Sequence, residues 1–192
     1  GTGDYLTVPS NAAFTFGTGD FTIEGWFYVN SFGANGFIPF DNRASSTAVP
    51  FNVGVTSAGL PYLYEGATAP TGSSGITLNT WGHIAWVRTS GVLKMFVNGV
   101  SVYSAAYTVN LTGTNCTIGG GVGGLAGYFL NGSLSNLRIV KGTAVYTAAF
   151  TPPTTPLTAI TNTSLLTCQS NKFIDNSSNN FTLTRNGDVA VK

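Results

Sequence analysis

Charged side chains are scarce in this chain of 192 residues. Lysine, arginine, aspartate and glutamate make up 8% of it, and eight basic residues nearly balance seven acidic ones. The net charge of +1 gives no field that would attract nucleic acid or an anionic membrane surface. Glycine, with 25 residues, and many Ser, Thr and Asn side chains supply the polar surface instead. The composition therefore argues against a polyanion-binding protein and predicts a nearly neutral, hydroxyl-rich exterior.

Metal-ligating and redox residues are also few. The chain has one histidine, two cysteines and no Cys-x-x-Cys pair, so neither zinc nor haem is predicted. Cys116 and Cys168 could form a single disulfide in an oxidising compartment. The alternative is that both are small buried hydrophobic residues, as free cysteines often are. Apolar runs are only as long as strands, so the sequence predicts no transmembrane helix.

Short strands separated by turn residues dominate what is present. Residues 81–103 predict three consecutive antiparallel strands, because Thr89–Gly91 is a compact loop and Asn98-Gly99 favours a type I′ turn. Many short strands with regular Gly and Asn breaks predict an all-β protein, either a sandwich or a barrel. The other strands predicted in the first 150 residues are 5–8, 21–29, 37–40, 51–55, 61–64, 115–118 and 134–140.

A proline-rich segment, Thr151–Pro156, marks a natural boundary. We expect a core module at residues 1–150 and a Pro/Thr-rich strap with C-terminal strands at residues 151–192. The strand-like pieces there are too few to fold alone, so they should dock on the core module or on a neighbouring subunit and cover a sheet edge. These pieces are residues 164–168, 181–183 and 189–191, with Asn186-Gly187 as a turn.

Several segments resemble the laminin-G-like modules of the concanavalin-A-like lectin and glucanase superfamily. Trp81–Arg88, followed by Val97–Gly99, is similar to the family's central hairpin, and Asp20–Phe27 is similar to its first long strand. The resemblance implies an antiparallel two-sheet β-sandwich with a jelly-roll topology. In such modules a segment like residues 165–178 often precedes the first strand. Its place near the end of this sequence predicts a permuted end or the opening of another tandem repeat.

The superfamily includes glycosidases, and their chemistry needs two carboxylates that face one cleft, typically two residues apart on a strand. No such pair occurs, since Thr22 and Trp26 occupy the same-face positions beside Glu24. His83 lies at the start of a strand, which favours a structural imidazole, and no Gly-x-Ser-x-Gly motif is present. A non-enzymatic protein is therefore expected. The seven acids are Asp4, Asp20, Glu24, Asp41, Glu65, Asp175 and Asp188.

Glycan binding is a stronger hypothesis, because flat aromatic rings complement the C–H face of a sugar. Trp26 and Tyr28 share a strand face with Glu24, and Trp86 shares a strand face with Arg88. If both faces lie on the outside, these five residues form a glycan platform. The alternative is that the rings fill the core between the sheets. Weaker candidates for the same role are Tyr62 and Tyr64.

The resemblance also raises the question of calcium binding. Some laminin-G-like modules bind calcium through loop carboxylates and backbone oxygens, so Asp41 and Asp175 are candidate ligands. Each lies in a separate loop without a second acid nearby. Hydrogen bonding to their own turns is the simpler explanation, and no cofactor is predicted.

Low charge, missing catalytic pairs and a hydroxyl-rich surface favour recognition or assembly. Residues 143–153 resemble modules of bacterial extracellular proteins and of phage fibres, tails and capsid decorations. The resemblance implies a virion surface component that assembles with other virion or extracellular subunits, as a homo-oligomer, and touches host glycans. The alternatives are a secreted or cell-surface lectin-like adhesin and an extracellular filament subunit. The sequence specifies neither the glycan nor the symmetry.

Overall fold

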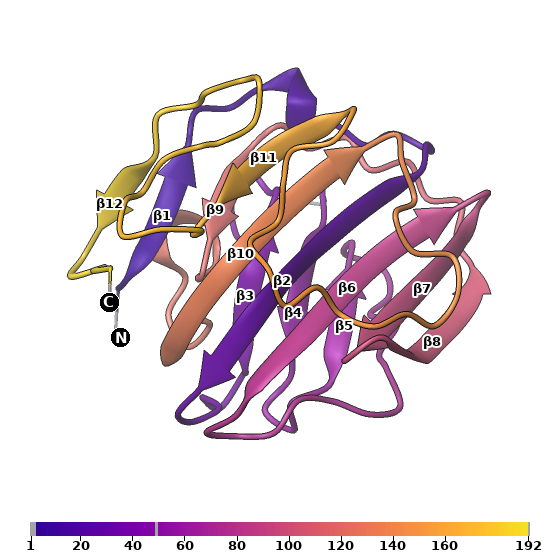
Figure 1. The fold of residues 1–192 in the computed structure, drawn as a ribbon, viewed down its shortest axis with the longest axis horizontal. Coiled ribbons are helices and arrows are strands. Elements are labelled where there is room, and N and C mark those ends of the chain that lie inside the picture. The colour runs from indigo at the N-terminus through magenta and orange to yellow at the C-terminus, as the bar shows by residue number, and fades with distance from the viewer. Residues whose placement is uncertain (1–2, 49, 192) are drawn as a thin grey trace.

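The computed structural model describes residues 3–48 and 50–191. They form two antiparallel sheets of six strands each, packed face to face (Figure 1). The predicted two-sheet sandwich is therefore confirmed. Two short 3-10 helices, η1 (Ala12–Phe14) and η2 (Val122–Gly124), are the helical elements of the described residues, and neither is long enough to cross a bilayer.

Sheet A has the strand order β12-β1-β9-β3-β4-β5, and sheet B has the order β11-β10-β2-β6-β7-β8. The strands of sheet A are β12 (Thr184–Asn186), β1 (Tyr5–Val8), β9 (Cys116–Ile118), β3 (Phe37–Asp41), β4 (Asn52–Val55) and β5 (Pro61–Tyr64). The strands of sheet B are β11 (Thr163–Thr167), β10 (Gly132–Lys141), β2 (Phe21–Val29), β6 (Trp81–Thr89), β7 (Val92–Val97) and β8 (Val100–Ala106).

The core lies between the sheets and follows from strand alternation. Side chains two residues apart on a strand point to the same side, so Ile23 and Phe27 of sheet B meet Phe40 and Val53 of sheet A. All four are fully buried. Phenylalanine fills much of this space, since the rings of Phe14, Phe16, Phe21, Phe40 and Phe51 contact one another at centroid distances of 5.2 to 6.3 Å.

Two-residue turns join the strands of the central hairpin. Asn98 and Gly99, between β7 and β8, have φ angles of 50° and 79°, as a type I′ turn requires. A side chain on Gly99 would also collide with the Phe150 carbonyl, because an added Cβ would lie 1.8 Å from that oxygen. The predicted hairpin is present, and its turn fits closely beneath a later part of the chain.

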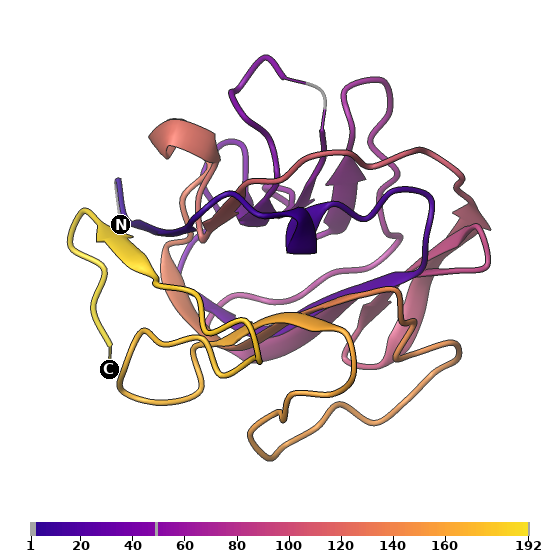
Figure 2. The ribbon, with the colours of Figure 1, turned by 90° about the horizontal axis from the view of Figure 1, so that it is seen from above.

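The segment that follows β10 crosses the outside of sheet B. Residues 142–162 contain no strand and lie against the face of sheet B that is turned away from sheet A (Figure 2). We call residues 142–162 the strap; it begins nine residues before the boundary expected from the sequence. Ala144, Tyr146 and Phe150 of the strap pack on the outer-face residues Ala85, Val87 and Phe96.

The chain after the strap contributes one edge strand to each sheet. β11 pairs with β10 in sheet B, and β12 pairs with β1 in sheet A (Figure 1). Two strand predictions are wrong in detail: the strand expected at 181–183 is found at 184–186, and residues 189–191 form no strand. The first difference follows from the pairing with β1, in which Tyr5 lies opposite Asn186. Residues 184–186 are the ones that pair with β1, so they form the strand.

Candidate functional site

The sheet register places the predicted platform residues on opposite faces of sheet B. In the pairing of β2 with β6, Ile23 lies opposite Trp86, so both point into the core. Because successive side chains alternate, Glu24, Trp26 and Tyr28 point to the outer face. The prediction of a single platform that combines both groups is therefore wrong.

Trp86 and Arg88 are interior residues, and both are fully buried. The Trp86 Nε1 donates a hydrogen bond of 2.9 Å to the carbonyl oxygen of Tyr62, which links the two sheets. The Arg88 guanidinium donates to three backbone carbonyls at 2.7 to 2.8 Å. Neither side chain can contact a glycan, so this part of the prediction is also wrong. The three carbonyls belong to Gly17, Gly19 and Val109.

Glu24 lies on the outer face but is fully buried beneath the strap. Its Oε1 accepts hydrogen bonds from Arg138 Nε and Nη2 at 2.9 and 2.6 Å, and its Oε2 accepts one from the Tyr146 hydroxyl at 2.7 Å. His83 Nε2 lies 3.2 Å from the same Oε2. Burial raises the pKa of Glu24, but the His83 hydrogen bond and the Arg138 charge outweigh it, so the pKa is lowered. Glu24 is therefore a structural carboxylate, and its predicted glycan contact is wrong.

The strap covers much of the aromatic surface on this face. The rings of Tyr146 and Phe150 stack with centroids 3.6 Å apart, and the Phe150 ring packs edge-on against His83 at 5.7 Å. Trp26 is half-buried and donates from Nε1 to the Pro153 carbonyl at 3.1 Å. Tyr28 is half-buried and packs against the exposed ring of Trp81. Glycan contact by Trp26 or Tyr28 stays a prediction.

The two calcium candidates already use their carboxylate oxygens. Asp41 accepts hydrogen bonds from Arg43 Nε, Nη2 and backbone N, and from the backbone N–H of Val122. Asp175 accepts from the Ser177 hydroxyl and from three backbone N–H groups. Each Asp closes its own turn by binding the N–H two residues later. Within residues 3–48 and 50–191, no group of three or more His, Cys, Asp or Glu side chains could hold a metal ion.

Cys116 and Cys168 are free thiols, so the structure does not contain the disulfide considered from the sequence. Cys116 belongs to β9 of sheet A, whereas Cys168 directly follows β11 of sheet B. Burial raises the pKa of Cys116, and it raises the pKa of Cys168 to about 11. Both thiols therefore stay protonated and unreactive near neutral pH.

The outer face of sheet A carries an open groove of about 540 Å³. The loop that follows β3, the loop that follows β5 and the η2 region rise around this face (Figure 2). We call it the face groove. Its lining residues are Asn35, Ile38, Arg43, Ser46, Asn52, Thr56, Ser57, Tyr62, Tyr64, Ala69, Thr71, Leu125 and Tyr128.

Tyr62 forms part of the floor of the face groove because its β4 partner is glycine. Gly54 pairs with Tyr62, and a Cβ added to Gly54 would lie 2.0 Å from Tyr62 Cζ. The tyrosine ring therefore occupies the space directly over β4, where any larger residue would displace it. Burial raises the pKa of Tyr62, and the neighbouring Tyr128 adds to this rise. The Tyr62 hydroxyl consequently stays protonated at neutral pH.

Asn52 supplies a polar group beside these rings. It pairs with Tyr64 across β4 and β5, lines the face groove and is 2% exposed. Its Oδ1 is buried without a hydrogen-bond partner. A buried acceptor left unpaired destabilises a protein by about 1–3 kcal/mol. Tyr62, Tyr64 and Tyr128 together present flat apolar surface, with the side-chain amide of Asn52 beside it.

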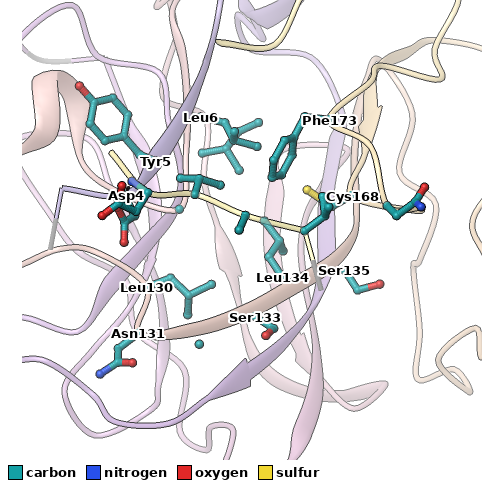
Figure 3. A pocket seen from close by; sticks show the side chains of 18 of the residues that line it. Asp4, Tyr5, Leu6, Leu130, Asn131, Ser133, Leu134, Ser135, Cys168 and Phe173 are labelled. Atoms are coloured by element: carbon teal, nitrogen blue, oxygen red, sulfur yellow. Dashed lines mark hydrogen bonds between the residues drawn. The ribbon is translucent and has the colours of Figure 1, made fainter. Parts of the chain in front are cut away.

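A second cavity, of about 640 Å³, opens at the edge of the sandwich between β1 and β10 (Figure 3). Leu6, Leu134, Cys168 and Phe173 cluster around it in Figure 3, and all four belong to the core or pack against it. This cavity is the open end of the inter-sheet core. Polar residues, among them Asn131, Ser133 and Ser135, and the exposed Trp81 line it as well, so it is a second candidate cavity beside the face groove.

Sequence reasoning ranked Tyr62 and Tyr64 below the tryptophans and did not select Asn52, Arg43 or Tyr128. Tryptophan is the larger aromatic residue, but its size gives no indication of which face it occupies. A signal that could have pointed to the tyrosines is the occurrence of two short strands in succession, one with glycine and the other with tyrosine at alternating positions. Glycine opposite tyrosine in adjacent strands permits an aromatic ring to lie across the sheet.

The chain resembles known proteins over most of its length. A family model described as the concanavalin A-like lectin/glucanases superfamily matches residues 1–149, which confirms the resemblance drawn from the sequence. No curated protein matches the chain. Among solved structures, a candidate carbohydrate-binding protein from Bacteroides ovatus superimposes with a TM-score of 0.72 at 15% identity. The match covers 99% of this chain and 60% of that one, so this chain spans less than two thirds of that protein.

Two further similar structures were solved with saccharides. The CBM40 domain of the IT-sialidase from Ruminococcus gnavus, bound to α2,3-sialyllactose, has a TM-score of 0.59 at 14% identity, covering 76% of this chain and 89% of that one. Domain 4 of an extracellular arabinanase from Geobacillus stearothermophilus, in complex with arabinotriose, has a TM-score of 0.57 at 14% identity, covering 73% and 68%. Identities this low show a shared fold.

Proposed function

Because the chain belongs to the concanavalin A-like lectin/glucanase superfamily, we propose that it binds carbohydrate and that the face groove is its binding site. The observation that carries this proposal is the Tyr62 ring lying over Gly54 in a groove that Tyr64, Tyr128 and the side-chain amide of Asn52 also line. A sugar ring has an apolar C–H face that stacks on an aromatic ring and hydroxyl groups that donate hydrogen bonds. The face groove supplies an aromatic ring for the C–H face of the sugar and polar groups for its hydroxyls.

Similar structures support the same class of ligand. The Ruminococcus gnavus domain holds sialyllactose, the Geobacillus stearothermophilus domain holds arabinotriose, and both have the fold of this chain. A fold alone does not fix a function, so the proposal depends on the groove and its side chains.

We propose binding without hydrolysis. Glycoside hydrolysis uses two carboxyl groups that flank the scissile bond. Among the described residues that line the face groove, none is acidic. Asp41, which pairs with the groove residue Asn52, is held by Arg43 and by the Val122 backbone. A bound glycan would therefore meet no free general acid or nucleophile.

Glycan-array screening followed by calorimetric titration of the best ligand tests the proposal. Tyr62→Ala removes the stacking ring, and truncating a central aromatic contact typically costs about 2 kcal/mol, or roughly a 30-fold rise in Kd. Trp81→Ala is the matched control, because Trp81 is an exposed aromatic residue on the opposite sheet that lines the second cavity and not the face groove. It should bind with unchanged affinity. Silence across a broad array, or loss of binding in Trp81→Ala alone, would refute the proposed site.

The biological setting is a separate proposal. Binding of a glycan suits a secreted or cell-surface lectin-like adhesin, and it also suits a virion component that touches its host or an extracellular filament subunit. Mass spectrometry of purified particles and of culture medium separates these settings. Recovery of the chain with intact particles supports the virion, and recovery only as free protein in the medium supports the secreted lectin.

A further inference from the structure

We infer that the face groove selects neutral glycans and discriminates against acidic ones such as sialylated or uronic-acid-containing saccharides. This inference rests on the proposed function, since it concerns the ligand of the same groove. It is carried by the position of one arginine, by the carboxylate that neutralises it, and by the uncharged polar lining of the rest of the groove.

Arg43 is the charged side chain among the described residues that line the face groove. Two of its three guanidinium nitrogens are committed to Asp41, with Nε 2.9 Å from Oδ1 and Nη2 2.7 Å from Oδ2. The third, Nη1, points to the Ser46 carbonyl at 3.4 Å. This two-point contact is the geometry with which an arginine would otherwise bind the carboxylate of an acidic sugar.

The ion pair is buried and held from both sides. Arg43 is 4% exposed and Asp41 is fully buried. Burial lowers the pKa of Arg43, but the hydrogen bonds and charge of Asp41 outweigh it and raise the pKa, so Arg43 stays charged. Asp41 also accepts the Val122 N–H at 2.9 Å, and the Arg43 carbonyl accepts from Asn115 Nδ2 at 2.9 Å. Neither partner is free to swing away when a ligand arrives.

The electrostatic consequence is a groove without net charge. A carboxylate entering it would lose its hydration without gaining an unpaired cation, and the cost of such a transfer is large. Asp41 lies directly opposite Asn52 in the pairing of β3 with β4. The Asn52 side chain therefore lies beside the Asp41 carboxylate on the outer face of sheet A. That arrangement favours hydroxyl donors and disfavours a further anion.

The remaining polar lining is uncharged. Asn35, Ser46, Thr56, Ser57 and Thr71 bring amides and hydroxyls, which both donate and accept hydrogen bonds. Such groups match the hydroxyls of a neutral saccharide. The groove is thus built to recognise a chain of neutral sugars by stacking on tyrosine and by hydrogen bonds to these amides and hydroxyls.

Titration of the wild-type protein with matched saccharides tests the inference. Lactose, arabinotriose, xylotriose and cellotriose serve as neutral probes, and α2,3-sialyllactose and trigalacturonic acid serve as acidic probes. At least one neutral probe should bind at least about tenfold more tightly than either acidic one. Its affinity should not change with salt concentration, because no charge pair forms. Tighter, salt-sensitive binding of an acidic probe would overturn the selectivity and leave carbohydrate binding intact.

The variant Asp41→Asn should gain affinity for an acidic glycan. It leaves the Arg43 charge unpaired at the groove wall, so the affinity for α2,3-sialyllactose relative to lactose should rise by about tenfold. The double variant Asp41→Asn/Arg43→Gln removes both charges and should keep the wild-type preference. Circular dichroism and thermal unfolding check that each variant folds, and the wild-type salt titration decides the question if one does not. Binding of no probe by the wild type would overturn the proposed function together with this inference.

Discussion

Replacing Glu24 by glutamine should destabilise the protein strongly, although the two side chains have nearly the same shape. Glu24 accepts two hydrogen bonds from Arg138 and one from Tyr146, and it lies beside His83. Its side chain is fully buried, and that of Arg138 is 6% exposed. Water therefore cannot replace the hydrogen bonds and the negative charge that the carboxylate provides.

The expected cost follows from the uncompensated charge. Leaving one member of a buried ion pair without its partner typically costs about 3–5 kcal/mol. The Arg138 Nη1 bond to the Thr158 carbonyl persists, but a carbonyl does not neutralise the guanidinium. For a chain of this length, roughly 2–4 °C per kcal/mol converts the loss to a decrease in Tm of about 6–20 °C.

Urea unfolding followed by tryptophan fluorescence measures the free energy of unfolding, and an unchanged m-value shows that the same surface is exposed. Asp188→Asn is the control, because Asp188 is exposed and its substitution should stay within about 0.5 kcal/mol. The double variant Glu24→Leu/Arg138→Met should lose less stability than Glu24→Gln, since no charge stays buried. A loss below about 1 kcal/mol in Glu24→Gln would refute the account of a desolvated ion pair.

Three further outcomes follow from the same structure. Because the pKa of Glu24 is lowered in the folded state, its contribution is complete above its ordinary pKa of 4.5 and is lost as the pH falls through the folded-state pKa. Urea midpoints should therefore decrease steeply on acidification below about pH 4.5 and much less in Glu24→Gln; parallel curves would contradict this. Gly54→Ala should displace the Tyr62 ring and weaken glycan binding as Tyr62→Ala does, and titration showing wild-type affinity would count against the site. Phe150→Ala should loosen the strap and cost about 2 kcal/mol, with faster proteolysis within residues 142–162; unchanged cleavage would show that the strap is held elsewhere.

The strands of the central hairpin were predictable because their signals are local. Alternation of apolar residues and the Asn98-Gly99 turn act over a few positions, and the structure has β7 and β8 on either side of that turn. The family resemblance added the two-sheet arrangement. Strand ends near the C-terminus were less predictable, since β12 takes its limits from β1, which lies about 180 positions earlier in the sequence.

The site was harder to predict because the sequence pattern does not say which face of a strand is covered. Trp26 and Trp86 are equally plausible as platform residues in the sequence, yet one contacts the strap and the other fills the core. Alternation shows only that residues two apart share a face. Which face meets the other sheet, and which meets the strap, depends on segments far away in the chain.

The sequence by itself determined the class of the fold and the nearly neutral character of the surface, because periodicity, turn residues and composition are properties of short segments and of totals. Only the tertiary structure decided that the strap covers Glu24 and its neighbours, that Arg43 is neutralised by Asp41, and that Tyr62 lies over Gly54 beside Asn52. Each of these depends on strand pairing, a tight turn or packing between segments that register brings together, and such contacts decide whether an aromatic or charged side chain is available to a ligand.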